Sequence, residues 1–253
     1  MMELATIIGS KAATAIRVNN LFVPASSIGN HLRAYTDPAL FVSKDYEPYN
    51  MTKSGSLTRV KFSTRHFAII THHQLSAPDY KYDQLAIHNP NTKKLITSHQ
   101  VIFQTDRNTN EADYDCLIFE FTESVEGGAL PKSGWYDLTN EIDAKLPKPN
   151  IVFGLGYPGY RNNIDYDNDV YPMAPNLVHG KESRPRIRSR LSFIPDPKID
   201  FSPDGMSGGP VFGCQIKNYT PEIFFAGIIT NASKKQFNFL SRSKLGSMFD
   251  LLD

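Results

Sequence analysis

The sequence predicts an all-β protein whose strands fall into two halves, followed by a C-terminal helix. The 253-residue chain has 17 prolines, and its apolar residues come in short runs bounded by Gly, Pro, Asn, Asp and Ser, as in strands separated by turns. Helical periodicity is convincing only near the end of the chain. Hydrophobic residues make up 40% of the chain; with glycine the share is about 46%, typical of a globular protein.

Eight segments carry the clearest strand signal. In chain order they are LTRVKF (57–62), FAIIT (67–71), QVIFQT (100–105), CLIFEF (116–121), IVFGLG (151–156), RIRSRLSF (186–193), PVFGC (210–214) and IFFAGIIT (223–230). Gly and Pro interrupt the region between the halves, which predicts a linker at 126–150. The strand-rich halves then span 55–125 and 151–253, and an N-terminal segment, 1–54, partly joins the first half.

The closing helix is predicted by an apolar stripe at steps of three to five residues between Leu240 and Leu252.

Charge and composition exclude several classes of partner. The 27 basic and 26 acidic residues give a formal charge of +1, so no whole-molecule field attracts nucleic acid or a membrane. No apolar run approaches the ~18 residues of a membrane span. Glu3 and Lys11 interrupt the pattern of a secretory signal. We therefore expect a soluble, cytoplasmic protein with reduced thiols at Cys116 and Cys214.

A basic stretch in the second half is a candidate docking face for an acidic partner. A solvated strand face is the simpler interpretation, because the chain as a whole is nearly neutral. The residues of the stretch are Lys181, Arg184, Arg186, Arg188 and Arg190.

The most specific motif is FSPDGMSGGPVFG (201–213), in which glycines crowd Ser207 into a tight turn before a buried strand. Small residues let a substrate carbonyl approach the backbone, and the N–H groups of Gly205 and Ser207 can converge as an oxyanion hole. The turn predicts a nucleophilic serine.

Such a serine needs a base, because its hydroxyl is a weak nucleophile at its free pKa. No histidine follows Ser207, which excludes the α/β-hydrolase order Ser, acid, His. His73 stands where apolar FAII (67–70) runs into THHQL (71–75), at the end of a buried strand. We favour His73 as the base, with His72 as the alternative.

A carboxylate should orient the imidazole and stabilise the imidazolium. ADYDCLIFEF (112–121) offers two acids directly before an apolar run. Asp115 abuts the expected strand and is preferred, and Asp113 is the alternative.

Together these motifs resemble the chymotrypsin/trypsin-like serine peptidase superfamily, particularly its disulfide-poor bacterial branches. FAIITHHQL, DYDCLIF and DGMSGGPVF carry the resemblance. Their order, His, Asp, Ser, is that of the family. The resemblance spans about residues 55–250 and implies two antiparallel β-barrels with the active site in the cleft between them.

The resemblance also implies where substrate binds. FFAGIIT (224–230) is similar to the strand beside the primary specificity pocket, so Thr230 would flank the aspartate, and Asn231 and Ala232 would face the peptide. Phe201 falls near the base of that pocket, where peptidases specific for basic residues carry Asp. A preference for Arg or Lys is therefore not implied.

The expected function is that of a serine endopeptidase, a hydrolase that cleaves protein or peptide substrates through an acyl-enzyme. This chemistry needs no cofactor and no metal. The alternative is a catalytically inactive binding module of the same fold, which would dock a peptide, protein or acidic partner at the cleft or at the basic stretch.

Overall fold

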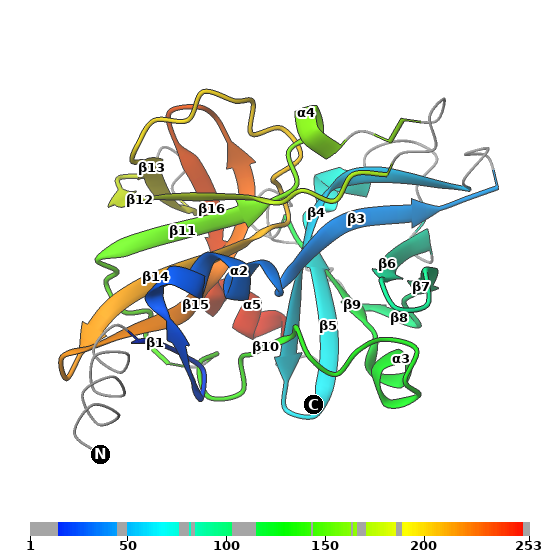
Figure 1. Ribbon diagram of the computed structural model, residues 1–253, viewed down its shortest axis with the longest axis horizontal. Coiled ribbons are helices and arrows are strands. Elements are labelled where there is room, and N and C mark those ends of the chain that lie inside the picture. Colours follow the sequence, from blue (N-terminus) through cyan, green and yellow to red (C-terminus); the bar gives the residue numbers. More distant parts are fainter. Residues whose placement is uncertain are drawn as a thin grey trace, which may run out of the picture.

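A computed structural model shows two eight-stranded, mainly antiparallel sheets (Figure 1). The structure describes residues 15–44, 50–75, 81, 84–102, 115–142, 144–162, 164–165, 171–185 and 189–249.

The first sheet is an open, curved half-barrel with strand order β7-β6-β3-β4-β5-β9-β8, and β10 pairs with β4. Its strands are β3 (Thr36–Val42), β4 (Met51–Phe62), β5 (Arg65–Ile70), β6 (Leu85–Asn89), β7 (Lys94–Thr97), β8 (Gln100–Ile102), β9 (Leu117–Glu120) and β10 (Tyr136–Asp137). The aromatic rings of Phe41, Phe119 and Phe121 are fully buried in a cluster with aliphatic side chains of these strands. This core fixes the ends of β5 and β9.

In the second sheet, β14 pairs with both β11 and β15, so six strands close into a barrel with order β14-β11-β12-β13-β16-β15. The strands are β1 (Ala15–Val18), β2 (Leu21–Pro24), β11 (Ile151–Gly156), β12 (Asn176–Ser183), β13 (Leu191–Pro195), β14 (Pro210–Lys217), β15 (Thr220–Ala232) and β16 (Phe237–Ser241). The β1–β2 hairpin extends this sheet, with β1 parallel to β15. The first 54 residues therefore contribute to both sheets, because β3 pairs with β4.

The predicted C-terminal helix is confirmed as α5 (Arg242–Phe249). It begins after Leu240, which belongs to β16. Its Phe249 ring packs against Phe62 and Phe67 of the first sheet, with centroids 5.1 and 5.2 Å apart. The helix thereby joins the end of the second barrel to the first sheet, as Figure 1 shows.

The other helices of the described residues are short. They are η1 (Ala25–Ser27), α2 (Ile28–Arg33), η2 (His72–Leu75), α3 (Thr122–Glu126) and α4 (Gly159–Asn162). Within the described ranges, no helix is both long and apolar enough to cross a membrane.

Each of the eight expected strands overlaps an observed one. The segment expected at 186–193 shows the largest difference, because β13 begins only at Leu191 and Arg190 precedes it. Residues 186–188 lie outside the described part of the chain.

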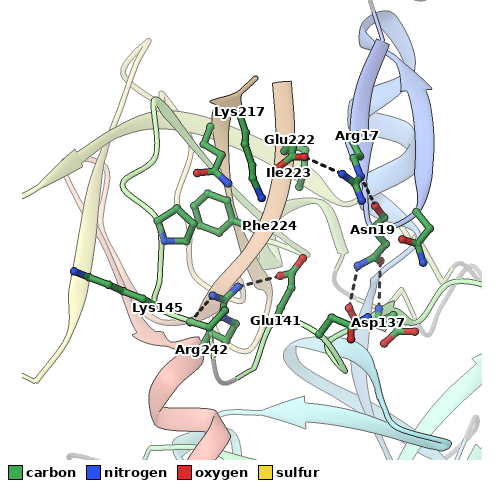
Figure 2. Close-up of a pocket in the computed structure, with 15 residues that line it drawn as sticks. Arg17, Asn19, Asp137, Glu141, Lys145, Lys217, Glu222, Ile223, Phe224 and Arg242 are labelled. Carbon is green, nitrogen blue, oxygen red and sulfur yellow. Dashed lines mark hydrogen bonds and ion pairs between the residues drawn. The ribbon is translucent and has the colours of Figure 1, made fainter. Parts of the chain in front are cut away.

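A charged pocket of about 470 Å³ lies where the linker, β1, β15 and the start of α5 meet (Figure 2). Arg17 is ion-paired with Glu222, and Arg242 with Glu141, each at 3.0 Å. The Arg242 side chain is 3% exposed and also donates to the carbonyl of Phe225. These contacts tie the linker to β15 and α5. None of the residues that line this charged pocket lines the second pocket, described below, which contains Ser207.

Arg242→Met is expected to lower the free energy of unfolding by about 3 kcal/mol or more, because it leaves the Glu141 carboxylate without its buried partner. Arg17→Met is the matched control, since the Arg17 side chain is 46% exposed and an exposed pair contributes about 1 kcal/mol or less. Urea denaturation measures both. Equal losses for the two variants would contradict a structural role for the Arg242 pair.

Candidate active site

One pocket of about 660 Å³ gathers most of the predicted site residues. Its walls come from the segments that follow β5 and precede β9, from the serine turn before β14, and from the end of β15. The predicted residues that line it are His72, His73, Asp115, Gly205, Ser207, Thr230, Asn231 and Ala232. The fold thus brings together the three motifs that lie far apart along the chain.

The neighbouring strands β5 and β9 place His73 beside Asp115. Ile70 at the end of β5 pairs with Leu117 at the start of β9, so the residues just after β5 and just before β9 lie side by side. Nδ1 of His73 is 2.8 Å from Oδ2 of Asp115, and the His73 amide donates to Oδ1 at 3.1 Å. A carboxylate only accepts hydrogen bonds, so this contact keeps the proton on Nδ1 and leaves Nε2 as the basic nitrogen of the neutral ring.

The sequence left two alternatives open, His72 as the base and Asp113 as the carboxylate that orients it. His72 lines the same pocket, but its side chain makes no hydrogen bond to another described residue, whereas His73 contacts both oxygens of Asp115. Asp113 lies outside the described residues. The contact with Asp115 favours His73, and its role as the base stays a prediction.

Glycines give the serine turn its shape. Gly205 and Gly208 have φ angles of +90° and +84°, which side chains rarely adopt. A Cβ at Gly205 would lie 2.8 Å from the carbonyl oxygen of Tyr157. Only glycine therefore fits this turn at position 205.

Two amides of the turn have no acceptor within the described part of the chain, those of Gly205 and Ser207. The amides of Met206, Gly208 and Gly209 each donate to a backbone carbonyl. Backbone N–H groups that are not used within the fold are the kind of donor that a developing oxyanion requires, so the role predicted for these two amides stays a prediction.

The Ser207 hydroxyl and the His73 imidazole line one pocket but have other partners. Oγ of Ser207 donates to the Thr230 carbonyl at 3.4 Å, its one hydrogen bond among described residues. Nε2 of His73 lies 3.3 Å from Oγ1 of Thr71. Catalytic hydrogen bonds are often long or misaligned without substrate, so proton transfer between Ser207 and His73 requires the two side chains to exchange partners.

Strand β4 of the first sheet holds the serine turn through its own hydroxyl groups. Oγ of Ser56 donates to the carbonyl of Gly205 at 2.7 Å. The backbone amide of Ser56 donates to the carbonyl of Ser207 at 2.9 Å. Oγ1 of Thr58 donates to the carbonyl of Gly208 at 2.7 Å. Neither residue was predicted, because nothing in the sequence shows that β4 lies beneath the serine turn.

Gln74 joins the histidine segment to the same strand. Its Nε2 donates to the carbonyls of Ser54 and Ser56, and its Oε1 accepts from the amide and hydroxyl of Thr71 at 2.7 and 2.8 Å. Gln74 is only 5% exposed. Because its side-chain amide is buried and makes these four hydrogen bonds, it fixes the segment that carries His73. The only sign of this in the sequence is an amide directly after the histidine.

The predicted substrate-binding residues do not all lie together. Thr230, Asn231 and Ala232 end β15 and line the pocket. Phe201 does not line it, because its ring stacks on Tyr160 with centroids 5.4 Å apart.

The basic stretch does not form the single exposed face expected from the sequence. Arg190 is 6% exposed and lines the Ser207 pocket, whereas Lys181 is exposed and lies 3.6 Å from Asp196. Arg184 is exposed, and Arg186 and Arg188 lie outside the described residues. Lys181 lies on β12, and Arg190 precedes β13, which begins at Leu191, so these two residues do not share one strand face.

Both cysteines are free thiols. Burial raises the pKa of Cys116 to about 12 and also raises that of Cys214. Among the described residues, no group of three or more His, Cys, Asp or Glu side chains is arranged to hold a metal ion.

Comparison with known proteins identifies the fold. No protein-family model matches the chain, and no curated protein matches it in sequence. The crystal structure of the protease Anisep from Arthrobacter nicotinovorans is similar, with a TM-score of 0.53 and 11% identity over 86% of this chain and 94% of that one. At this identity the likeness shows the fold alone, which is the two-barrel chymotrypsin-like fold that the motifs predicted.

Proposed function

We propose that the protein is a serine endopeptidase of the chymotrypsin type, in which Ser207 is the nucleophile, His73 the general base and Asp115 the group that orients it. One observation carries the proposal: the His73–Asp115 pair shares a pocket with a serine whose turn has two amides that find no acceptor among the described residues. The similarity of fold to a protease supports hydrolysis of protein or peptide substrates.

The first half of the reaction forms an acyl-enzyme. Nε2 of His73 accepts the Ser207 proton as Oγ adds to the carbonyl carbon of the peptide bond. The amides of Gly205 and Ser207 donate to the oxygen that becomes negative. The imidazolium, stabilised by Asp115, then gives its proton to the nitrogen of the leaving peptide as the C–N bond breaks.

The second half regenerates the enzyme. Water loses a proton to Nε2 of His73 and adds to the acyl carbon, and the same two amides bind the oxyanion. When the intermediate collapses, Ser207 leaves with the proton from His73 and the acid product is released. Both halves use the same groups, and no metal or cofactor enters.

Substrate binding must move two side chains before the first step. The Ser207 hydroxyl leaves the Thr230 carbonyl, and Nε2 of His73 leaves Thr71. The hydrogen bond of Ser207 is long, at 3.4 Å, and therefore weak. Nε2 of His73 lies 3.3 Å from Oγ1 of Thr71, whose one hydroxyl proton is donated to Gln74, so this contact also offers little resistance. An extended substrate that pairs with the end of β15 competes for the Thr230 carbonyl, which favours this exchange.

A fluorophosphonate probe tests the proposal directly, because it reacts with a serine that a neighbouring base activates. The expected result is one covalent label per chain, located at Ser207 by peptide mass mapping and absent in Ser207→Ala. Ser98→Ala is the matched control, since Ser98 lies outside the pocket, and it should label fully.

The opposite result distinguishes the alternative function. A folded protein that takes no label at Ser207 would favour a catalytically inactive binding module of the same fold. The retained Thr230 and Thr71 contacts would then describe the resting state of a docking pocket.

A further inference from the structure

A smaller pocket adjoins the one that contains Ser207. Its volume is about 390 Å³, and it shares Asp204 and Gly205 with the larger pocket. Thr52, Lys53 and Gly55 of β4 form one wall. Gly205, whose amide would bind the oxyanion, therefore lines both pockets.

The proposed reaction assigns the two pockets to different parts of a substrate. The end of β15, from Thr230 to Ala232, lines only the larger pocket, and a peptide that pairs with this strand end places its acyl part there. The part of the substrate peptide that follows the scissile bond then runs past Gly205. The smaller pocket thus takes the residues that leave with the amine.

Lys53 gives the smaller pocket its chemistry. Of the described residues that line it, Lys53 is the only cationic one and Asp204 the only anionic one. The Lys53 ammonium donates to the Tyr157 carbonyl at 2.9 Å and has no other partner among described residues. An ammonium has three donors, so two remain for a ligand.

The surroundings of Lys53 make an added anion favourable. Burial lowers the pKa of Lys53 to about 8, because desolvation penalises its charge. Asp204 does not relieve this penalty, since no ion pair joins the two residues. The Asp204 carboxylate is exposed and accepts from the Ser202 hydroxyl at 2.6 Å, so water screens its repulsion of a bound anion more than the attraction of Lys53.

We infer that the smaller pocket binds a carboxylate that lies just C-terminal to the scissile bond, and that Lys53 selects it. This inference rests on the proposed function. Two kinds of substrate carry such a group: a peptide with Asp or Glu after the cleaved bond, and a peptide whose free C-terminus lies there. Lys53 is then a specificity residue for the leaving part of the substrate.

The test uses quenched fluorescent peptides built on the best-cleaved sequence from a random library. One pair differs only by Glu or Gln at the first or second position after the scissile bond. A second pair ends at the second position as a free acid or as an amide. The first pair reports a side-chain carboxylate and the second a terminal one. We expect the charged member of at least one pair to have a kcat/KM about 10-fold higher in the parent protein.

Variants assign the preference to Lys53. Lys53→Met keeps the apolar stem and should bring the ratio of kcat/KM to about 1, whereas Lys53→Arg retains the charge and should keep the ratio well above 1. Lys94→Met is the matched control, because Lys94 is exposed on β7 outside both pockets, and it should keep the full ratio. Circular dichroism and thermal melting show whether each variant is folded.

The possible outcomes separate the inference from the function on which it rests. Cleavage with equal rates within both pairs, or a ratio that survives Lys53→Met, would overturn the inference and leave the proposed function intact. Absence of both cleavage and fluorophosphonate labelling would overturn the proposed function, and the inference with it.

Discussion

Ser207→Ala is expected to lower kcat/KM for any peptide that the parent cleaves by about 10⁴-fold or more. The substitution removes the only atom that forms the acyl bond, whereas the two amides and the extended binding edge remain. The turn should stay intact, because its shape depends on Gly205, Gly208 and the contacts to Ser56 rather than on the Ser207 hydroxyl.

Ser98→Ala is the matched control and should cleave at the parent rate. The same peptide is measured with the parent, Ser207→Ala and Ser98→Ala. Cleavage by Ser207→Ala at the parent rate would show that another group performs the chemistry. Unchanged thermal melting ensures that a low rate reports the lost nucleophile rather than unfolding.

Asp115→Asn should lower kcat by about 10⁴-fold with a much smaller change in KM. In asparagine an NH₂ group, which donates, replaces one of the two carboxylate oxygens of Asp115. The backbone N–H of His73 donates to Oδ1, so that position must remain an oxygen. The amide group therefore turns its oxygen to the backbone and its nitrogen to Nδ1, which forces the neutral imidazole to carry its proton on Nε2. That tautomer cannot accept the Ser207 proton.

Asp196→Asn provides the matched control, because Asp196 is an exposed carboxylate paired with Lys181. It should leave kcat within about 2-fold of the parent, since exposed pairs contribute little. The pH dependence of kcat, measured from about pH 5 to 10, completes the comparison. A parent-like profile in Asp115→Asn would contradict the orienting role of Asp115.

The eight strands predicted from the sequence all carry apolar runs, but others were missed, among them β3, although it contains the run ALFV, and β12, which has no such run. IVFGLG and PVFGC are apolar throughout, and both are observed strands, β11 and β14. Strand β12 (Asn176–Ser183) reads NLVHGKES and alternates only weakly. It forms because β11 and β13 pair with it on either side, and tertiary pairing of this kind leaves no local signal.

The sequence predicted which residues form the candidate site, a histidine, an aspartate and a serine in that order along the chain. The structure adds the contacts that these residues make. The ends of apolar strands indicated His73 and Asp115, because strand ends are rigid and can face a cleft. The supports supplied by Ser56, Thr58 and Gln74 could not be predicted, since each depends on which strand lies beneath the serine turn. The burial of Arg190 in the Ser207 pocket depends in the same way on where β13 begins.

The junction between the serine turn and β4 is made of hydroxyl and amide donors, and neither cysteine of the chain is in a disulfide. Thiol–disulfide exchange therefore has no bond to attack at this junction. We therefore expect the turn to keep the same arrangement with excess glutathione or dithiothreitol as in air, so that its geometry does not depend on the redox potential of its surroundings.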